Sequence, residues 1–144
     1  MVESLLTGGA YVVLAITLTG LAAGSRLPRW PLALSAAACA FVAIQAWTVG
    51  TVFAWLASEL PEAQFDAISQ NTLLFNLFIY PMGVLCLAGY TTLAVVGWRR
   101  GAFSRGASAV LVAAGLAALL GPFPPTGLLG AIGIAWLARS LKNA

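Results

Sequence analysis

The sequence contains no histidine, and only 8% of its 144 residues carry a charge. Without histidine, a His-ligated haem or chlorophyll, a His-containing zinc site and a Ser-His or Cys-His catalytic pair are excluded. The two cysteines, Cys39 and Cys86, stand alone in apolar segments without Cys-x-x-Cys spacing, which is typical of buried core residues. We therefore predict no enzyme activity, no catalytic residue, no cofactor and no metal site.

Charge is scarce because apolar residues fill most of the chain, 61% of it. Average soluble domains are about 45–50% apolar and about 25% charged, so a water-soluble globule of this composition is excluded. The net charge of +3 comes from seven Lys and Arg against four Asp and Glu. These few cations are spread over short stretches and form no basic groove, so no nucleic-acid partner is expected. The sequence predicts an all-α integral membrane protein whose surroundings are the lipid bilayer.

Long apolar segments alternate with short polar or proline-rich breaks. We expect one membrane domain over residues 1–144, with spans at residues 5–24, 31–57, 71–98, 106–121 and 127–138. The first segment has an acidic flank at Glu3 and is too long for a signal-peptide core, so it is expected to be retained. An acidic outer loop with a short interfacial helix is expected at residues 58–70. The last two segments are short, so a re-entrant hairpin is the alternative to two thin crossings.

The placement of the cations predicts the orientation of the bundle. They occur in the first and third breaks and at the C-terminal end, as Arg26, Arg29, Arg99, Arg100, Arg105, Arg139 and Lys142. Cytoplasmic loops of membrane proteins are enriched in Lys and Arg. We therefore expect a bundle of five transmembrane helices with the N-terminus outside and the C-terminus cytoplasmic. The Ala-, Gly-, Leu- and Arg-rich composition favours the cytoplasmic (inner) membrane of a prokaryote.

Polar side chains within the expected spans suggest an intramembrane cluster. Gln45 and Thr48 share one face of the second segment, and Asn76 and Tyr80 share one face of the third. Counted from the outer boundary, Thr48 and Tyr80 lie at similar depths of about 13 Å. We expect Gln45 and Tyr80 to face each other in the bundle interior. Such a cluster is either interhelical hydrogen-bonding glue or a site for a neutral solute.

Small residues recur at every fourth position of the fourth segment, as Ala109, Ala113, Ala117 and Gly121. Such stripes allow close backbone contact between membrane helices. This stripe is therefore a candidate helix-packing interface, either within the monomer or between subunits.

These features favour a non-enzymatic membrane protein that acts as an accessory or scaffold subunit of a membrane complex, or as a homo-oligomer. The sequence identifies no small-molecule ligand. The alternative is a small transporter or channel for a neutral or weakly polar solute that passes along the Gln45, Asn76 and Tyr80 face.

Overall fold

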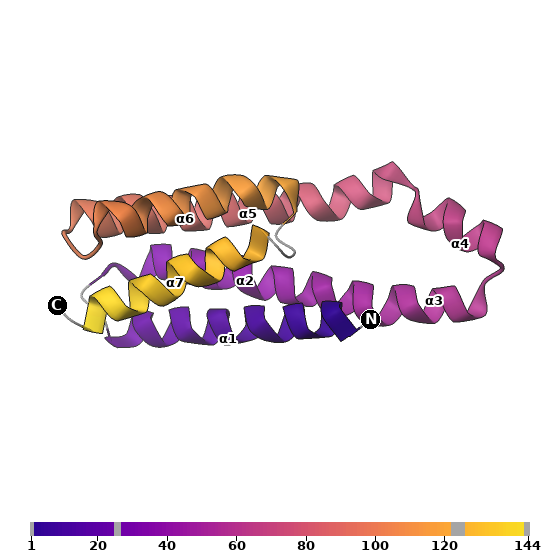
Figure 1. Cartoon of the computed structure of the whole chain (residues 1–144), viewed down its shortest axis with the longest axis horizontal. Coiled ribbons are helices and arrows are strands. Elements are labelled where there is room, and N and C mark those ends of the chain that lie inside the picture. Colours follow the sequence, from indigo (N-terminus) through magenta and orange to yellow (C-terminus); the bar gives the residue numbers. More distant parts are fainter. Residues whose placement is uncertain (1, 25–26, 122–125, 143–144) are drawn as a thin grey trace.

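The computed structural model describes residues 2–24, 27–121 and 126–142, and all regular elements within these ranges are helical. The elements shown in Figure 1 are α1 (Val2–Gly24), α2 (Arg29–Thr48), the π-helical segment η1 (Val49–Phe53), α3 (Ala54–Glu59), α4 (Glu62–Ser69), α5 (Thr72–Arg99), α6 (Arg105–Ala117), the 3₁₀ turn η2 (Ala118–Leu120) and α7 (Thr126–Lys142). The predicted all-α class is confirmed for this part of the chain. Arg26 and the prolines at 122, 124 and 125 lie outside the described residues.

Three stretches are long and apolar enough to cross a membrane: Val2–Gly24, Arg29–Glu59 and Ile79–Arg99. Two shorter apolar helices, Arg105–Leu120 and Leu128–Arg139, follow them. This pattern is consistent with a location in a membrane. The break expected at residues 58–70 contains the short helix α4.

The long helices form a bundle in which each packs on a neighbour. Helix α1 packs on α2, α2 on α5, α5 on α6 and α6 on α7, while α1 and α7 contact each other far less. Figure 1 shows α3 and α4 continuing beyond the end of this bundle at which α1 begins. The core between the helices is mostly Leu and Ala, and it includes Cys39, Cys86 and Tyr90.

Glycines allow the closest approaches between the helices. A methyl group added at Gly89 in α5 would lie 3.1 Å from the Ser35 Cα atom in α2. One added at Gly83 would lie 2.9 Å from the Ala118 carbonyl oxygen in η2. Backbone-to-backbone packing of this kind provides the van der Waals contact that holds helices together where lipid removes the hydrophobic driving force.

A Schellman motif ends α5 and turns the chain into α6. The Ala102 N–H donates to the Gly97 carbonyl oxygen at 2.9 Å, and the Gly101 N–H donates to the Trp98 carbonyl oxygen at 2.9 Å. Gly101 has a φ of +69°, the left-handed conformation that glycine adopts without steric cost. The Phe103 ring then packs over Gly97. The turn is therefore fixed by local sequence and presents its arginines at one end of the bundle.

Candidate functional site

The structure does not assemble the predicted polar cluster. Gln45 is buried at 8% exposure, whereas Tyr80 is 60% exposed and Asn76 is exposed as well. The Thr48 hydroxyl donates to the Ile44 carbonyl oxygen of its own helix at 2.8 Å. Within the described part of the chain, no hydrogen bond joins any two of these four side chains.

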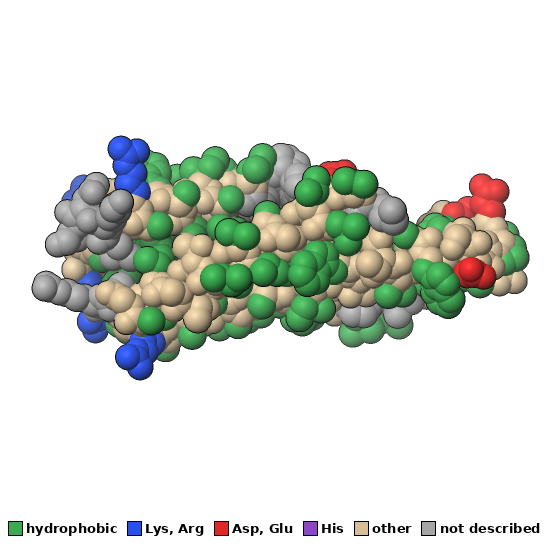
Figure 2. All heavy atoms as spheres, turned by 90° about the horizontal axis from the view of Figure 1, so that it is seen from below, with side chains coloured by type: hydrophobic (Ala, Val, Ile, Leu, Met, Phe, Trp, Pro, Cys, Tyr) green, Lys and Arg blue, Asp and Glu red, His purple; other side chains and the backbone are tan. Residues whose placement is uncertain are grey.

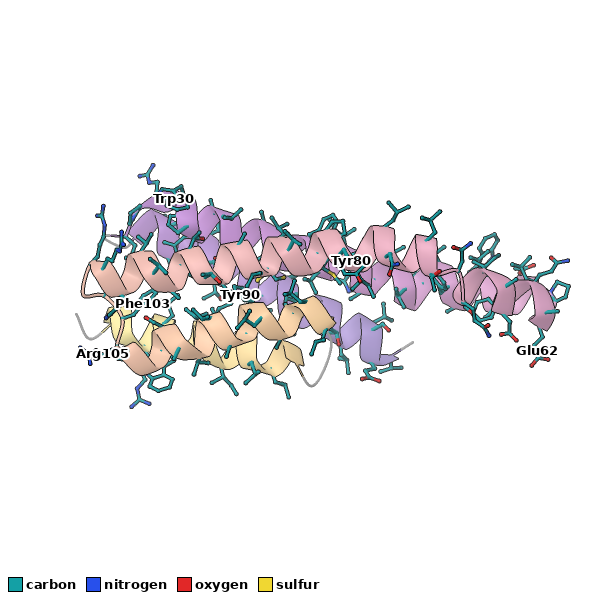
Figure 3. The ribbon with its side chains drawn as sticks, turned by 90° about the horizontal axis from the view of Figure 1, so that it is seen from above. Trp30, Glu62, Tyr80, Tyr90, Phe103 and Arg105 are labelled. Atoms are coloured by element: carbon teal, nitrogen blue, oxygen red, sulfur yellow. The ribbon has the colours of Figure 1, made fainter. Side chains whose placement is uncertain are left out.

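The predicted mutual burial of Gln45 and Tyr80 is therefore wrong. The buried face of α5 is set by Met82, Cys86 and Tyr90, which are spaced four residues apart. Tyr80 lies two residues before Met82, about 200° away around the helix, and so it points outward. Figure 3 shows Tyr80 partway along α5, with Trp30, Phe103 and Arg105 at one end of the molecule and Glu62 at the other.

The predicted small-residue stripe lies mainly on the outer surface of α6. Ala109 and Ala113 are exposed, Ala117 is half-buried, and only Gly121 is buried. The packing of α6 within the monomer uses a different face, formed by Ala107, Leu111, Ala114, Gly115 and Ala118. Packing within the monomer therefore does not explain the Ala109 and Ala113 positions, which remain available to an interface between subunits.

A polar group that the sequence analysis did not identify lies at the centre of the bundle. The Ser35 hydroxyl in α2 donates to the Gly89 carbonyl oxygen in α5 at 2.9 Å. One turn further along, the Cys39 Sγ atom lies 3.4 Å from the Tyr90 hydroxyl oxygen. The sequence signal for this group is a four-residue spacing on each helix, which places Ser35 with Cys39 on one face of α2 and Cys86 with Tyr90 on one face of α5.

This central group links α2 to α5 and also reaches α7. The Tyr90 ring is buried against Gly130, so it also contacts α7. Among the described residues, the buried polar side chains are Thr7, Ser35 and Gln45, and no charged side chain is buried. Nor does any set of three His, Cys, Asp or Glu side chains gather in the described ranges.

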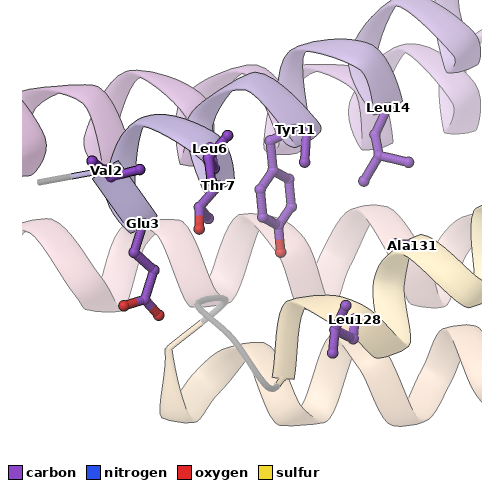
Figure 4. A pocket seen from close by; sticks show the side chains of 9 residues that line it. Val2, Glu3, Leu6, Thr7, Tyr11, Leu14, Leu128 and Ala131 are labelled. Atoms are coloured by element: carbon purple, nitrogen blue, oxygen red, sulfur yellow. The ribbon is translucent and has the colours of Figure 1, made fainter.

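An apolar groove of about 580 Å³ separates α1 from α7, and we refer to it as the α1/α7 groove. One wall is α1 from Val2 to Leu14, and the other is Leu128 and Ala131 of α7. Figure 4 shows the Glu3, Thr7 and Tyr11 side chains all pointing from α1 toward α7. These residues are four apart and therefore share one face of the helix, a pattern that the sequence analysis also missed.

A helical arm projects from the opposite end of the bundle to the arginines. We define the arm as α3 and α4, and neither helix contains a buried residue. It carries Glu59, Glu62 and Asp66 and also Trp55, whose side chain is 59% exposed. Figure 2 shows acidic side chains at one extremity and basic side chains at the other, with a mostly apolar surface between them that also carries acidic atoms partway along.

No protein-family model, curated protein or solved structure matches this chain. Its candidate sites therefore rest on its own geometry: the central polar group, the outer face of α6, the arm and the α1/α7 groove.

Proposed function

We propose that this protein is a non-enzymatic integral membrane protein that serves as an accessory or scaffold subunit, packing against copies of itself or against a larger membrane complex. The observation that carries this proposal is the arm. The continuous helix Arg29–Glu59 has 31 residues, a length of about 46 Å, which exceeds a hydrocarbon core of about 30 Å. The excess projects beyond the bundle with Trp55 uncovered, and exposed tryptophans are frequent anchors in protein interfaces.

The outer face of α6 supports the same proposal. Ala109 and Ala113 present small side chains on a surface that the monomer does not use. A helix from another subunit can approach such a face closely enough for backbone contact. The arm and this stripe would then provide two separate contacts, one beyond the bilayer and one within it.

The topology that accompanies this role has five crossings, with the N-terminus outside and the C-terminus in the cytoplasm of a prokaryotic cell. Its support is the separation of charge: Arg29, Arg99, Arg100, Arg105 and Arg139 lie at one end and the acids of the arm at the other (Figure 2). The run Arg105–Leu120 covers about 24 Å, enough for a thin crossing. A re-entrant hairpin differs only in that its apex would stop short of the outer surface.

The solute-transporter alternative has weaker support. It requires Gln45, Thr48, Asn76 and Tyr80 to line one interior path, but Tyr80 faces outward and the Thr48 hydroxyl is bonded within its own helix. The buried Gln45 amide alone does not define a path.

Association can be tested with two differently tagged copies and with native membranes. We expect solubilisation in a mild neutral detergent to yield either both tags together or a stoichiometric membrane partner. Trp55→Ala, or a pair of changes at Ala109 and Ala113 to Leu, should reduce that association while the monomer stays folded. Val13→Ala, on the exposed face of α1, serves as the control. A monodisperse monomer without a partner from native membranes would refute the proposal.

A further inference from the structure

The α1/α7 groove has a polarity that changes with depth. At one end lies the Glu3 carboxylate, and one turn deeper lies the Thr7 hydroxyl. The Tyr11 side chain follows one turn beyond Thr7, and the rest of the lining is apolar, with Ala10, Leu14, Leu128 and Ala131. Glu3 and Thr7 are four residues apart, or about 6 Å along the helix axis. A phospholipid presents its headgroup, its ester carbonyls and its acyl chains in the same order from the membrane surface inward.

Thr7 has a hydroxyl that the fold does not use. Thr17, Thr19, Thr48, Thr51 and Thr92 each donate to the carbonyl oxygen four residues earlier, the usual solution for threonine in a membrane helix. The Thr7 side chain is only 9% exposed and makes no hydrogen bond to any described residue. It points into the groove in Figure 4. The Thr91 hydroxyl in α5 also lacks a hydrogen-bond partner among the described residues, but it is enclosed by the fold. The Thr7 hydroxyl instead lines the open groove, where a ligand with an acceptor at that depth can satisfy it.

The length and exposure of the groove fit one acyl chain. From Val2 to Leu14 the groove wall extends about 18 Å, close to the thickness of about 15 Å for one leaflet of the hydrocarbon core. The groove opens sideways, because Leu6 and Leu128 on its two walls are exposed. A lipid can therefore enter from the bilayer without passing through the bundle.

The fold also explains why this space exists. The 3₁₀ turn η2 lies level with Gly83, which contacts the Ala118 and Leu119 backbone, whereas α1 extends as far as Gly50, which contacts Ser4. The outer half of α1 thus has α2 on one side and no full-length helix on the other. An apolar helix face left open in this way is covered by lipid or by protein.

We propose that the α1/α7 groove binds one phospholipid with an ammonium headgroup, with the ammonium at the Glu3 carboxylate, an ester carbonyl accepting from the Thr7 hydroxyl and one acyl chain lying along α1. Glu3 selects the headgroup, since a carboxylate attracts an ammonium and repels an anionic headgroup. Which leaflet supplies the lipid depends on the proposed topology, whereas the site itself depends only on insertion in a membrane.

Native mass spectrometry of the delipidated protein in neutral detergent tests this site. The probes are phosphatidylethanolamine and phosphatidylglycerol with identical acyl chains. We expect one phosphatidylethanolamine to bind more tightly than phosphatidylglycerol. Thr7→Val and Glu3→Gln should each weaken that binding about fivefold, the effect of one lost hydrogen bond or ion pair. Thr17→Val, whose hydroxyl is bonded within α1, and Glu62→Gln on the arm are the matched controls.

Two further measurements test whether the acyl chain lies in the groove. A phosphatidylethanolamine with a photoreactive group near the end of its acyl chain should cross-link the wild-type protein near Leu14 or Ala131. Ala10→Trp should fill the groove and abolish binding without changing the oligomeric state. Equal binding of both lipids, unchanged binding in Thr7→Val and Glu3→Gln, or cross-links spread around the bundle would overturn the proposal. If Ala10→Trp instead separates a dimer and leaves lipid binding unchanged, a second copy occupies the groove and the lipid site is refuted, while the scaffold role stands.

Discussion

The indole ring of Trp47 in α2 lies directly against Gly8 in α1, and its Nε1 atom donates a hydrogen bond to the Leu5 carbonyl oxygen at 3.3 Å. The missing side chain of Gly8 makes room for the ring. Near the same end of α1, a methyl group added at Gly50 would lie 3.1 Å from the Ser4 Cβ atom. These two contacts fix the N-terminal part of α1 on α2 and η1, and so they also fix the α1 wall of the α1/α7 groove.

The Trp47–Gly8 contact predicts that alanine lowers the stability of the protein at position 8 but not at position 9. Gly8→Ala places a methyl group where the Trp47 ring lies and should destabilise the protein by about 1–3 kcal/mol, the usual cost of overpacking. Gly9→Ala is the matched control, because a methyl group there meets nothing within 4 Å. Thermal unfolding in detergent measures both. Equal midpoints for the two variants would show that the ring moves aside freely.

The fold class could be predicted from the sequence because the bilayer imposes strong constraints on composition and on segment length. Apolar segments of about 20 residues separated by Arg-rich or Pro-rich breaks leave few alternatives to a helical bundle. The end of the third segment was likewise predicted at residue 98, before the break that contains Arg99, Arg100 and Arg105, and α5 ends at Arg99. Helix ends therefore agree with the predicted segments to within a few residues at most boundaries.

Side-chain directions could not be predicted in the same way. Hydropathy is nearly uniform around the membrane helices, so no amphipathic pattern shows which face of α5 is buried. The depth estimate placed Thr48 and Tyr80 at one level and was little affected by the helix end, which lies at Glu59 instead of residue 57. It gave no direction around the helix axis, and Tyr80 points outward. In α6, small residues occupy several faces, so spacing alone did not distinguish Ala113 from Ala114. Only the packed structure makes that distinction.

The buried polar groups of α2 should respond in opposite ways to apolar substitution. Ser35→Ala removes the 2.9 Å hydrogen bond to the Gly89 carbonyl oxygen and should cost about 0.5–1 kcal/mol. Gln45→Leu should leave stability unchanged or raise it, because no described residue hydrogen-bonds the buried Gln45 amide. Denaturant titration in detergent micelles measures both changes. A larger loss for Gln45→Leu than for Ser35→Ala would reveal a ligand or water held by the amide.

The separation of charge along the bundle predicts the accessibility of its two ends. In a background with Cys39→Ala and Cys86→Ala, single cysteines at positions 62 and 105 should react with an impermeant maleimide from opposite sides of the membrane. Glu62 begins α4 in the arm, and Arg105 begins α6 at the arginine end. Labelling of position 62 in intact cells, and of position 105 only after permeabilisation, is the expected result. Labelling of both from one side would contradict the proposed topology.

Substitutions at two adjacent alanines in α6 should affect different properties, one the stability of the monomer and the other the association of subunits. Ala114 is buried at 2% exposure in the monomer, so Ala114→Leu should destabilise the fold by about 1–3 kcal/mol. Ala113 is exposed, so Ala113→Leu should leave monomer unfolding unchanged, yet it should weaken a contact between subunits that needs close backbone approach.

Leu116→Ala is the control for the lipid-facing surface, since Leu116 is already exposed and large, and it should change neither property. Thermal unfolding and the mass of the detergent complex, measured for all three variants, separate these outcomes. If Ala113→Leu changes neither the unfolding midpoint nor the mass, the outer stripe of α6 faces lipid and the intersubunit contact within the bilayer must be sought elsewhere. If it lowers the midpoint as much as Ala114→Leu does, α6 is rotated from the orientation described, and the small-residue stripe packs within the monomer.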